Sequence, residues 1–466
     1  MGFIGPVAAL KRIDNEQKLI AGILENGELI MLYDDARGWH MIFPMIEAGY
    51  GHLRFQTRPS LKRVEYDNPS IVQGVAITLG GQLVKFTGYL PPYPSRWSVE
   101  FPAILAGEPS MRFYGEPTLV PALFYPFVPL GIHLFWEEEE ARRSGWFGYI
   151  YAVDSRNELI ELNNLTGTWQ LINVTRSFDP FLSLVHPPIV VLGGAASAAG
   201  EPLVGRKIFA LTLPGRIMRI GHDETDDGHA WTVTSMTRLA IAEGFNFIPP
   251  ISGHISGDDE TYDWIFARVP SSLATEGIAS VLGVRMIHEP HDSLDTHWFN
   301  PFFGAMTQAP SIIDDTSGGG FLENLFLWEV TAPFETRMGD PIGGNIVSLH
   351  FSNEEVAGEI EIARGRADDV ERFSWVTAIS MGPDNMQAIF GITEAGNLVQ
   401  LWNYPDRAWR RDRPLSRELE LLSRRGGVDD SFVDPRWLPP GGSTVPYMPD
   451  AWRSYIVSRG IPWPPR

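Results

Sequence analysis

The hydrophobic and polar positions of this chain repeat one unit, in which short apolar strands are separated by turns. The clearest copy has an apolar stretch at 387–393, a turn at Ala395 and Gly396, and a second apolar stretch at 397–402. A polar loop and a strand led by Trp409 complete the unit. Short apolar or alternating runs bounded by Gly, Asn and Asp predict strands and hairpins.

Six further copies of the unit can be traced along the chain. Asn26-Gly27, between two apolar runs in the first copy, is a strong signal for a hairpin turn. Weaker copies are expected between 215 and 396, one of them leading to Trp298. The turn residues of the first four copies and the Trp residues that follow them are Gly27, Gly81, Asn157 and Gly215, with Trp39, Trp97, Trp169 and Trp231.

Radial repetition of four-stranded units predicts an all-β fold, a β-propeller. We expect it to span residues 1–423 with seven blades, and six is the second choice. The alternative is one or two β-sandwiches whose hairpins share a pattern. Residues 424–466 are rich in Pro and Trp, and we expect this C-terminal extension to form a strap across one face of the propeller or a flexible tail.

Composition and charge narrow the range of partners. The 466-residue chain is 44% hydrophobic, enough for a large core, and its lack of Cys excludes disulfides and thiolate metal sites. A net charge of −20 argues against nucleic-acid binding. No run approaches the ~18 apolar residues of a membrane span, and the N-terminus lacks the charged and then apolar segments of a signal peptide. We therefore expect a soluble, cytoplasmic protein without a membrane partner. Secretion by another route stays open.

The repeated unit resembles the repeats of tectonin-type and fungal fucose-binding propeller lectins. The resemblance is carried by the stretches AIFGITEAGNLVQLW, from Ala388, and YIYAVDSRNELIEL, from Tyr149. It implies a propeller that binds sugars in pockets between blades. It also implies an Arg and a Glu at equivalent positions of successive blades, and we find no such aligned set in the sequence.

Candidate binding residues lie in the connections between blades, which should open on the same face as the second hairpin turn of each blade. These connections place Arg beside aromatic residues, and this pairing suits a planar or anionic group because guanidinium offers forked donors while the ring adds contact area. The same residues could instead only seal the blades. The candidates are His52, Arg54, Arg112, Tyr114, Glu116, His186 and Arg372.

Two other features of the sequence could carry chemistry. The runs 222–229 and 288–297 are rich in His and carboxylates, which bind divalent metals, but we predict solvated polar loops there rather than a metal site. The recurrent Trp residues could stack on sugars, although packing between adjacent blades explains their regular position better. No nucleophile or nucleotide motif stands in a usable context, and no cofactor is expected.

Three functions are compatible with these observations. The favoured one is binding of a carbohydrate or another small polar ligand on the face of the interblade loops. The alternatives are an enzyme, a hydrolase, lyase or isomerase with Arg, His and carboxylates in a central funnel, and a scaffold for protein partners. A lectin with repeated sites would keep its loops alike, whereas unequal loops would favour an enzyme.

Overall fold

The computed structural model describes most of residues 2–121 and 148–178 and, between 190 and 411, mainly the strands. The predicted extension at 424–466 lies outside the described residues. The chain divides into two compact units. One comprises Met1–Gln73, Phe86–Val99 and Gly365–Arg466, and the other comprises Gly74–Lys85 and Glu100–Arg364.

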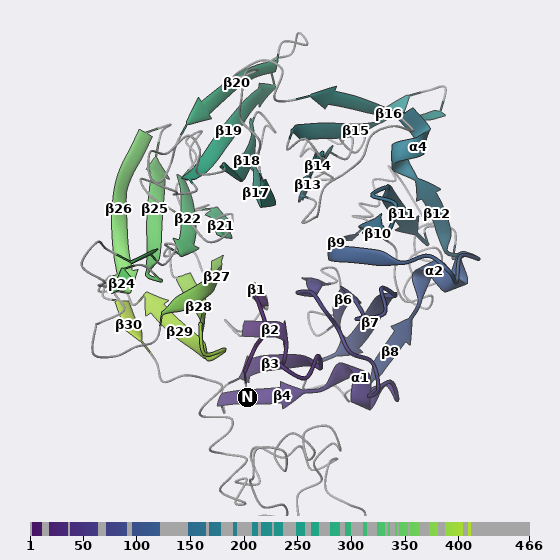
Figure 1. The fold of residues 1–466 in the computed structure, drawn as a ribbon, viewed down its shortest axis with the longest axis horizontal. Coiled ribbons are helices and arrows are strands. Elements are labelled where there is room, and N and C mark those ends of the chain that lie inside the picture. Colours follow the sequence, from purple (N-terminus) through teal and green to yellow (C-terminus); the bar gives the residue numbers. More distant parts are fainter. Residues whose placement is uncertain are drawn as a thin grey trace, which may run out of the picture. The chain divides into compact units, whose positions relative to one another are not determined.

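The first unit holds two complete four-stranded antiparallel sheets, and in both the strand order follows the sequence (Figure 1). A short helix, α1 (Pro44–Glu47), follows the first of them. The strands are β1 (Ala8–Lys11), β2 (Lys18–Ile23), β3 (Leu29–Asp35) and β4 (Gly38–Ile42), and β27 (Phe373–Ser380), β28 (Gln387–Thr393), β29 (Leu398–Asn403) and β30 (Trp409–Arg411).

Another sheet, of order β5-β6-β7-β8, has residues in both units. Its fourth strand leads into helix α2 (Pro102–Leu105) of the second unit. The strands are β5 (Ser60–Arg63), β6 (Ile71–Ile77), β7 (Leu83–Tyr89) and β8 (Trp97–Glu100).

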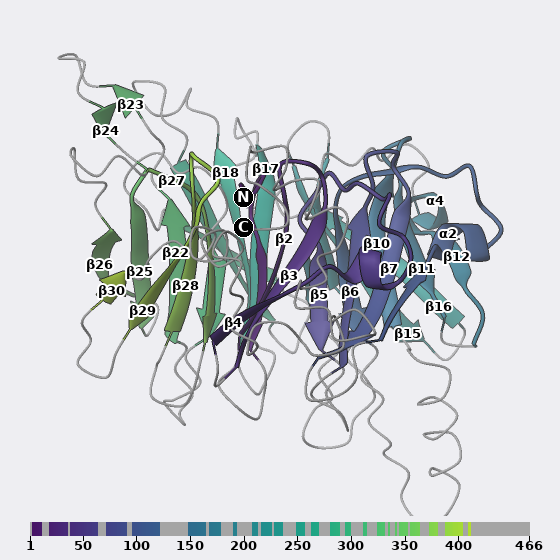
Figure 2. The ribbon, with the colours of Figure 1, turned by 90° about the horizontal axis from the view of Figure 1, so that it is seen from below.

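The second unit holds four complete four-stranded antiparallel sheets and a two-stranded one, β23-β24. In the sheet of order β12-β11-β10-β9, the last three strands along the chain lie side by side (Figures 1 and 2). Helix α4 (Val174–Phe178) directly follows β12. The strands are β9 (Phe113–Pro121), β10 (Gly148–Asp154), β11 (Leu159–Asn163) and β12 (Gln170–Asn173); β13 (Val190–Leu192), β14 (Lys207–Leu211), β15 (Ile217–Thr225) and β16 (Gly228–Ser235); β17 (Ile248–Ser256), β18 (Tyr262–Val269), β19 (Ser280–His288) and β20 (Leu294–Phe299); β21 (Ser311–Asp314), β22 (Asn324–Val330), β25 (Ile346–Ser352) and β26 (Glu355–Ala363); and the pair β23 (Phe334–Glu335) and β24 (Pro341–Ile342).

These sheets are four-stranded meanders, and the fold is a β-propeller, as the sequence predicts. Seven such sheets are present in the described part of the chain, where the sequence places its seven repeats. Greek-key connections, which β-sandwiches use, are absent from these sheets because each strand pairs with its sequence neighbour, save for the β23-β24 insertion. The blade number and the strap at the C-terminus stay predictions.

The core of each unit forms where the apolar faces of two sheets meet. In the first unit, Ile30 and Leu32 of β3 pack in one cluster with Phe390 of β28 and Leu398 of β29. In the second unit, residues of β6, β9, β10 and β11 form a cluster that includes Phe113. The alternation of strand side chains between two faces places such residues inside, and burial of each large side chain contributes about 1.5–3 kcal/mol.

Our prediction of loops at 222–229 and 288–297 is wrong for most of these residues. The first run forms the end of a hairpin in which β15 and β16 pair, with His222 opposite Trp231 and Glu224 opposite His229. The second includes the end of β19 and the start of β20, with His288 opposite Leu294. The pairing with a neighbouring apolar strand extends through these polar residues, so tertiary context overrides their low strand propensity.

Membrane insertion by a helix finds no support in the described residues, since none of their helices has the length and apolarity to span a bilayer. The described helices α1, α2 and α4 are each only one turn long.

Candidate binding site in the interblade loops

Two interblade loops have the same sequence pattern and the same local structure. We name residues 43–55 (FPMIEAGYGHLRF) the first loop module and residues 101–113 (FPAILAGEPSMRF) the second loop module. Each begins with Phe-Pro and a one-turn helix, for which Pro is suited because its fixed φ fits the first helical position. Each then turns at a Gly with positive φ, 83° at Gly49 and 89° at Gly107.

The Arg near the end of each loop module is held in one orientation by backbone carbonyls. Arg54 donates from Nη1 to the carbonyl oxygens of Gly51 (2.7 Å) and Leu53 (2.8 Å). Arg112 donates from Nη1 to the carbonyl oxygens of Pro109 (2.9 Å) and Met111 (2.8 Å), which are the equivalent positions. The two guanidinium groups are therefore presented in the same way.

The aliphatic part of each Arg lies on a glycine of a hairpin turn. A Cβ added to Gly27 would lie 3.1 Å from Cβ of Arg54, and one added to Gly81 would lie 3.2 Å from Cβ of Arg112. Both glycines also have positive φ, 80° and 78°. The turn needs Gly for its backbone conformation and for the close approach of the Arg.

The Arg-Phe dipeptide of the second loop module connects two successive hairpin turns. The N–H of Phe113 donates to the carbonyl of Gly81 (2.8 Å), and the carbonyl of Arg112 accepts from the N–H of Ser155 in the next turn (2.8 Å). The Phe113 ring is buried in the core of the second unit. One dipeptide thus fixes an Arg, two turns and a core contact together.

The same backbone connections recur elsewhere and reveal a set of equivalent positions. Four dipeptides take this position: Gly2-Phe3, Arg54-Phe55, Arg112-Phe113 and Arg372-Phe373. Each ends in a buried Phe, and three of them begin with an Arg that is one of our candidate binding residues. The corresponding bonds are Phe55 N–H to Gly27 O (2.7 Å), Phe3 N–H to Gly396 O (2.9 Å), Glu25 N–H to Gly2 O (2.9 Å) and Glu394 N–H to Arg372 O (2.7 Å). Arg54, Arg112 and Arg372 are therefore structurally equivalent, with Gly2 in the fourth place. The repeated Arg-Phe in the sequence is the signal that would have revealed this set.

A buried carboxylate in the first hairpin turn lies beside the Arg of the first loop module. Glu28, which directly follows Gly27, is only 4% exposed, and neither of its carboxylate oxygens accepts a hydrogen bond from the described residues. Its Oε1 lies 3.3 Å from Nη2 of Arg54, whose side chain is 35% exposed. Burial raises the pKa of Glu28, and the neighbouring Asn26 side chain and the charge of Arg54 offset this only in part.

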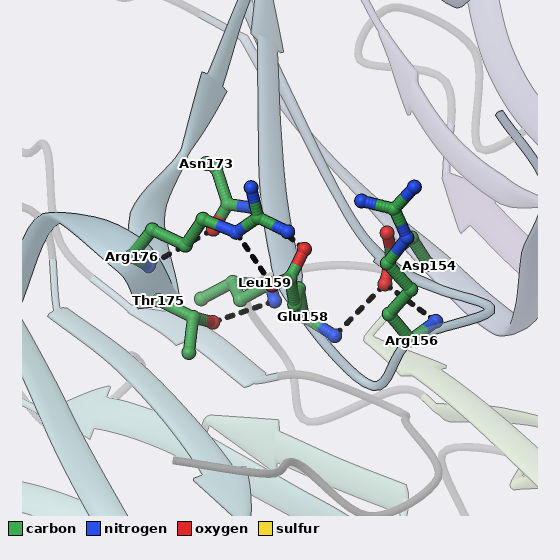
Figure 3. Close-up of polar contacts among 7 residues, drawn as sticks. All are labelled: Asp154, Arg156, Glu158, Leu159, Asn173, Thr175 and Arg176. Carbon is green, nitrogen blue, oxygen red and sulfur yellow. Dashed lines mark hydrogen bonds and ion pairs between the residues drawn. The ribbon is translucent and has the colours of Figure 1, made fainter. Parts of the chain in front are cut away.

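The third hairpin turn, between β10 and β11, is stabilised by its own side chains (Figure 3). Asp154 Oδ1 accepts hydrogen bonds from the N–H groups of Arg156 and Glu158, both at 2.9 Å. Asn157 takes the positive φ, 65°, that Gly has in the other turns. Tyr114, one of our candidates, donates its hydroxyl hydrogen to Oδ1 of Asn157.

Glu158 stands at the position equivalent to Glu28, but both of its carboxylate oxygens accept hydrogen bonds from described side chains, whereas those of Glu28 accept none. Arg176 of helix α4 donates from Nε to Oε1 (2.7 Å), and Asn173 donates from Nδ2 to Oε2 (2.8 Å), as Figure 3 shows. Partial burial raises the pKa of Glu158, but these hydrogen bonds and the charge of Arg176 outweigh it and lower the pKa. The two turns thus hold the same residue type in opposite electrostatic environments.

This difference predicts opposite effects of two matched substitutions on stability. Because the pKa of Glu28 is raised in the folded state, the protonated carboxyl contributes favourably to the free energy of unfolding below the ordinary pKa near 4.5. This contribution is lost as pH rises through the folded-state pKa. Glu28→Gln should therefore be more stable than the wild type at pH 7, by about 1 kcal/mol, the cost of one unsatisfied buried group.

Glu158 should show the opposite effect. Because its pKa is lowered in the folded state, its carboxylate stabilises the protein above about pH 4.5, and this stabilisation is lost as pH falls through the folded-state pKa. Glu158→Gln should therefore be less stable than the wild type at pH 7. Urea denaturation at pH 4 and pH 7 measures both, and a loss of stability in Glu28→Gln equal to that in Glu158→Gln would refute the contrast.

The other candidate residues lie around the loop modules to different extents. His52 is exposed in the first loop module, with its ring centroid 6.3 Å from that of Tyr50. Glu116 lies in β9, two residues after Tyr114, and is half-buried. His186 is outside the described residues. The structure thus brings Arg112 and Tyr114 together at one turn of the second unit, and it brings Arg54 and His52 together in one loop of the first.

The packing between adjacent blades that we predict for the regular Trp residues is seen for Trp39, whereas the contact described for Trp97 is within its own sheet. Trp39 of β4 meets Phe390 of β28 edge-to-face, with centroids 6.2 Å apart. Trp97 lies directly against the backbone of Gly88, where no side chain would fit. Trp169 packs against the core of the second unit. The side chains of Trp231 and Trp409 lie outside the described residues.

No group of three or more His, Asp or Glu side chains stands in a metal-binding arrangement within the described part of the chain. The side chains of 222–229 and 288–297 lie outside it.

Comparison with known proteins shows a likeness to lectins in fold. No family model matches the chain, and no curated protein does. The BP39L lectin from Burkholderia pseudomallei has a TM-score of 0.55 at 11% identity, over 89% of this chain and 99% of that one. A mutant of the Aleuria aurantia lectin in complex with α-methyl-L-fucoside has a TM-score of 0.42 at 11% identity, over 78% and 96%. AofleA from Arthrobotrys oligospora has 0.43 at 12%, over 78% and 88%.

These identities are low, so the likeness concerns the fold, and the TM-scores of the last two structures are too low to add to the argument. The predicted resemblance to propeller lectins is confirmed at this level.

Proposed function

We propose that this chain is a lectin-like protein that binds carbohydrate through the Arg residues of its interblade loops. The observation that carries the proposal is the duplication of the loop module: two loops of identical local structure present Arg54 and Arg112 on the same kind of support. A lectin with repeated sites would keep its loops alike, whereas an enzyme with one active site would not need to. The duplicated loops therefore favour repeated ligand sites over a single catalytic funnel.

The geometry of Arg112 suits the recognition of sugar hydroxyls. Its Nη1 is occupied by two carbonyls, and its side chain is exposed, so Nε and Nη2 remain as donors toward solvent, without a partner in the described residues. Hydroxyl oxygens accept such hydrogen bonds. Because the two carbonyls already fix the guanidinium plane, binding costs little additional side-chain entropy.

A polar ring at the neighbouring turn adds contact area. Tyr114 donates to Asn157, and the carbonyl of Arg112 accepts from the Ser155 N–H, so the Tyr114 hydroxyl and the backbone of Arg112 are bonded to the same turn. Aromatic surface beside polar donors is typical of small-molecule sites. Of the three solved structures described above, the one with a TM-score above 0.5 is named a lectin, which is in line with this proposal.

The test is a glycan array probed with the labelled protein, followed by titration of the strongest hit. Arg112→Gln should weaken binding by at least about tenfold, the equivalent of one lost hydrogen bond to a charged group. Arg96→Gln is the matched control, because Arg96 is an exposed Arg directly before β8, outside the loop modules and the hairpin turns bonded to them. A blank array, or equal binding by Arg112→Gln and the wild type, would refute the proposal.

A further inference from the structure

Acidic residues distinguish the surroundings of Arg54 from those of Arg112 at three equivalent positions, two in the hairpin turn beneath each Arg and one in the loop module. Around Arg54 these are Glu25 and Glu28 in the hairpin turn and Glu47 at the end of α1, and around Arg112 they are Leu79, Gln82 and Leu105. The turns correspond residue by residue, since Leu24 N–H donates to Glu28 O and Thr78 N–H donates to Gln82 O, both at 2.9 Å. Each of these three carboxylates around Arg54 is thus a neutral residue around Arg112, while Glu108 of the second loop module takes the place of Tyr50.

These replacements change the charge that a ligand would meet. In the first loop module, Nη2 of Arg54 faces Glu28 at 3.3 Å, so its positive charge is compensated by a carboxylate. In the second, Arg112 forms no ion pair within the described residues, and the residue in the place of Glu28 is the neutral Gln82. Glu108, the one carboxylate of the second loop module, is exposed and is not paired with Arg112.

The flanks of Arg112 are also unusually apolar for a surface. Leu79 is 64% exposed in the turn on which Arg112 lies, and Leu105 is 59% exposed on the helix that leads into its loop. Both belong to the few large hydrophobic residues exposed in the described part of the chain. Apolar neighbours lower the local dielectric once a ligand covers them, which strengthens a charge-assisted hydrogen bond.

We propose that the two loop modules differ in specificity, and that the second binds a saccharide bearing a carboxylate, which the first rejects. This inference rests on the proposed function. A carboxylate can accept parallel hydrogen bonds from Nε and Nη2 of Arg112, the two donors that its backbone partners leave available. At Arg54 the same ligand meets the charge of Glu28, and like charges at an interface are strongly disfavoured. Gln82 and Glu28 are therefore the residues that determine specificity.

The test uses an array in which each saccharide is present as neutral, carboxylate-bearing and sulfate-bearing forms, probed at about 0.15 M salt so that long-range charge is screened. Three variants are compared with the wild type: Gln82→Glu, Glu28→Gln and the control Glu158→Gln. We expect the wild type to retain a carboxylate-bearing saccharide. Gln82→Glu should bind it at least about tenfold more weakly, the equivalent of about 1.4 kcal/mol, while its binding of neutral saccharides is unchanged. Glu28→Gln should gain a second equivalent of the carboxylate-bearing ligand, and Glu158→Gln should keep the saccharide preference and stoichiometry of the wild type in spite of its lower stability.

Several results would overturn the inference. Binding of neutral saccharides alone would exclude the acidic ligand and leave the proposed function in place. Binding of sulfate-bearing forms alone would assign Arg112 to a different anion. Unchanged acid binding in Gln82→Glu, at an unchanged melting temperature, would remove Gln82 as the determinant. A blank array would refute both this inference and the proposed function.

Discussion

Arg54→Ala is expected to lose about 2 kcal/mol of the free energy of unfolding, whereas Arg112→Ala should lose less than about 1 kcal/mol. The two residues have the same backbone partners, so the difference comes from the residue beneath them. Removing Arg54 leaves the buried carboxylate of Glu28 without a cationic partner among the described residues. Loss of one partner of a buried pair costs ~3–5 kcal/mol, and the partial exposure of Arg54 reduces that figure.

A double-mutant cycle in urea denaturation measures this coupling. Glu28→Gln in the Arg54→Ala background should restore most of the lost stability, because it removes the uncompensated charge. Arg112→Ala combined with Gln82→Ala is the matched cycle at the second loop module and should show additive effects. Equal destabilisation by Arg54→Ala and Arg112→Ala would mean that the ion pair contributes nothing and that both Arg residues serve the loop alone.

Phe113→Ala is expected to cost about 3–5 kcal/mol, the range for removal of a fully buried aromatic side chain. Phe113 is buried in the cluster of the second unit, and its N–H and the adjacent Arg112 carbonyl connect two hairpin turns. The cavity would therefore remove a core contact at the point where the second loop module is anchored. Ligand binding at Arg112 should weaken together with stability.

Met111→Ala is the control for this substitution. Met111 is only partly buried against the same cluster, two residues before Phe113, so its loss should cost about 1 kcal/mol. Thermal or urea denaturation of the two variants compares them directly. Similar losses in both would contradict the anchoring role of Phe113.

The strand pattern of this protein could be predicted from the sequence because the local signals agree with the final structure. Gly27 and Gly81 take the positive φ that the turns require, and the apolar runs beside them form buried strands. Trp39 packs against Phe390 as expected from its regular place in the repeat. In each case the turn chemistry and the hydrophobic period specify the same element.

The candidate site was predicted only in part, because equivalence between loops depends on contacts across hairpins. Arg54, Arg112 and Arg372 were selected one by one, and their common position follows from backbone bonds to turns that are distant in sequence. Nor could the sequence distinguish Glu28 from Glu158. Both follow a turn residue with positive φ, yet only the carboxylate oxygens of Glu158 accept hydrogen bonds, from Arg176 and Asn173, whereas Arg54 lies 3.3 Å from Glu28 as an ion pair. The hairpins at 222–229 and 288–297 escaped prediction because polar residues continue a strand once an apolar partner strand is in place.

The central claim is that the duplicated loop modules are duplicated binding sites, and calorimetric titration with a neutral saccharide selected from the array tests it most directly. We predict that the wild type binds at least two equivalents, and that Arg54→Gln and Arg112→Gln each lower this number by one while the protein stays folded. A stoichiometry of one that neither variant changes would contradict the account.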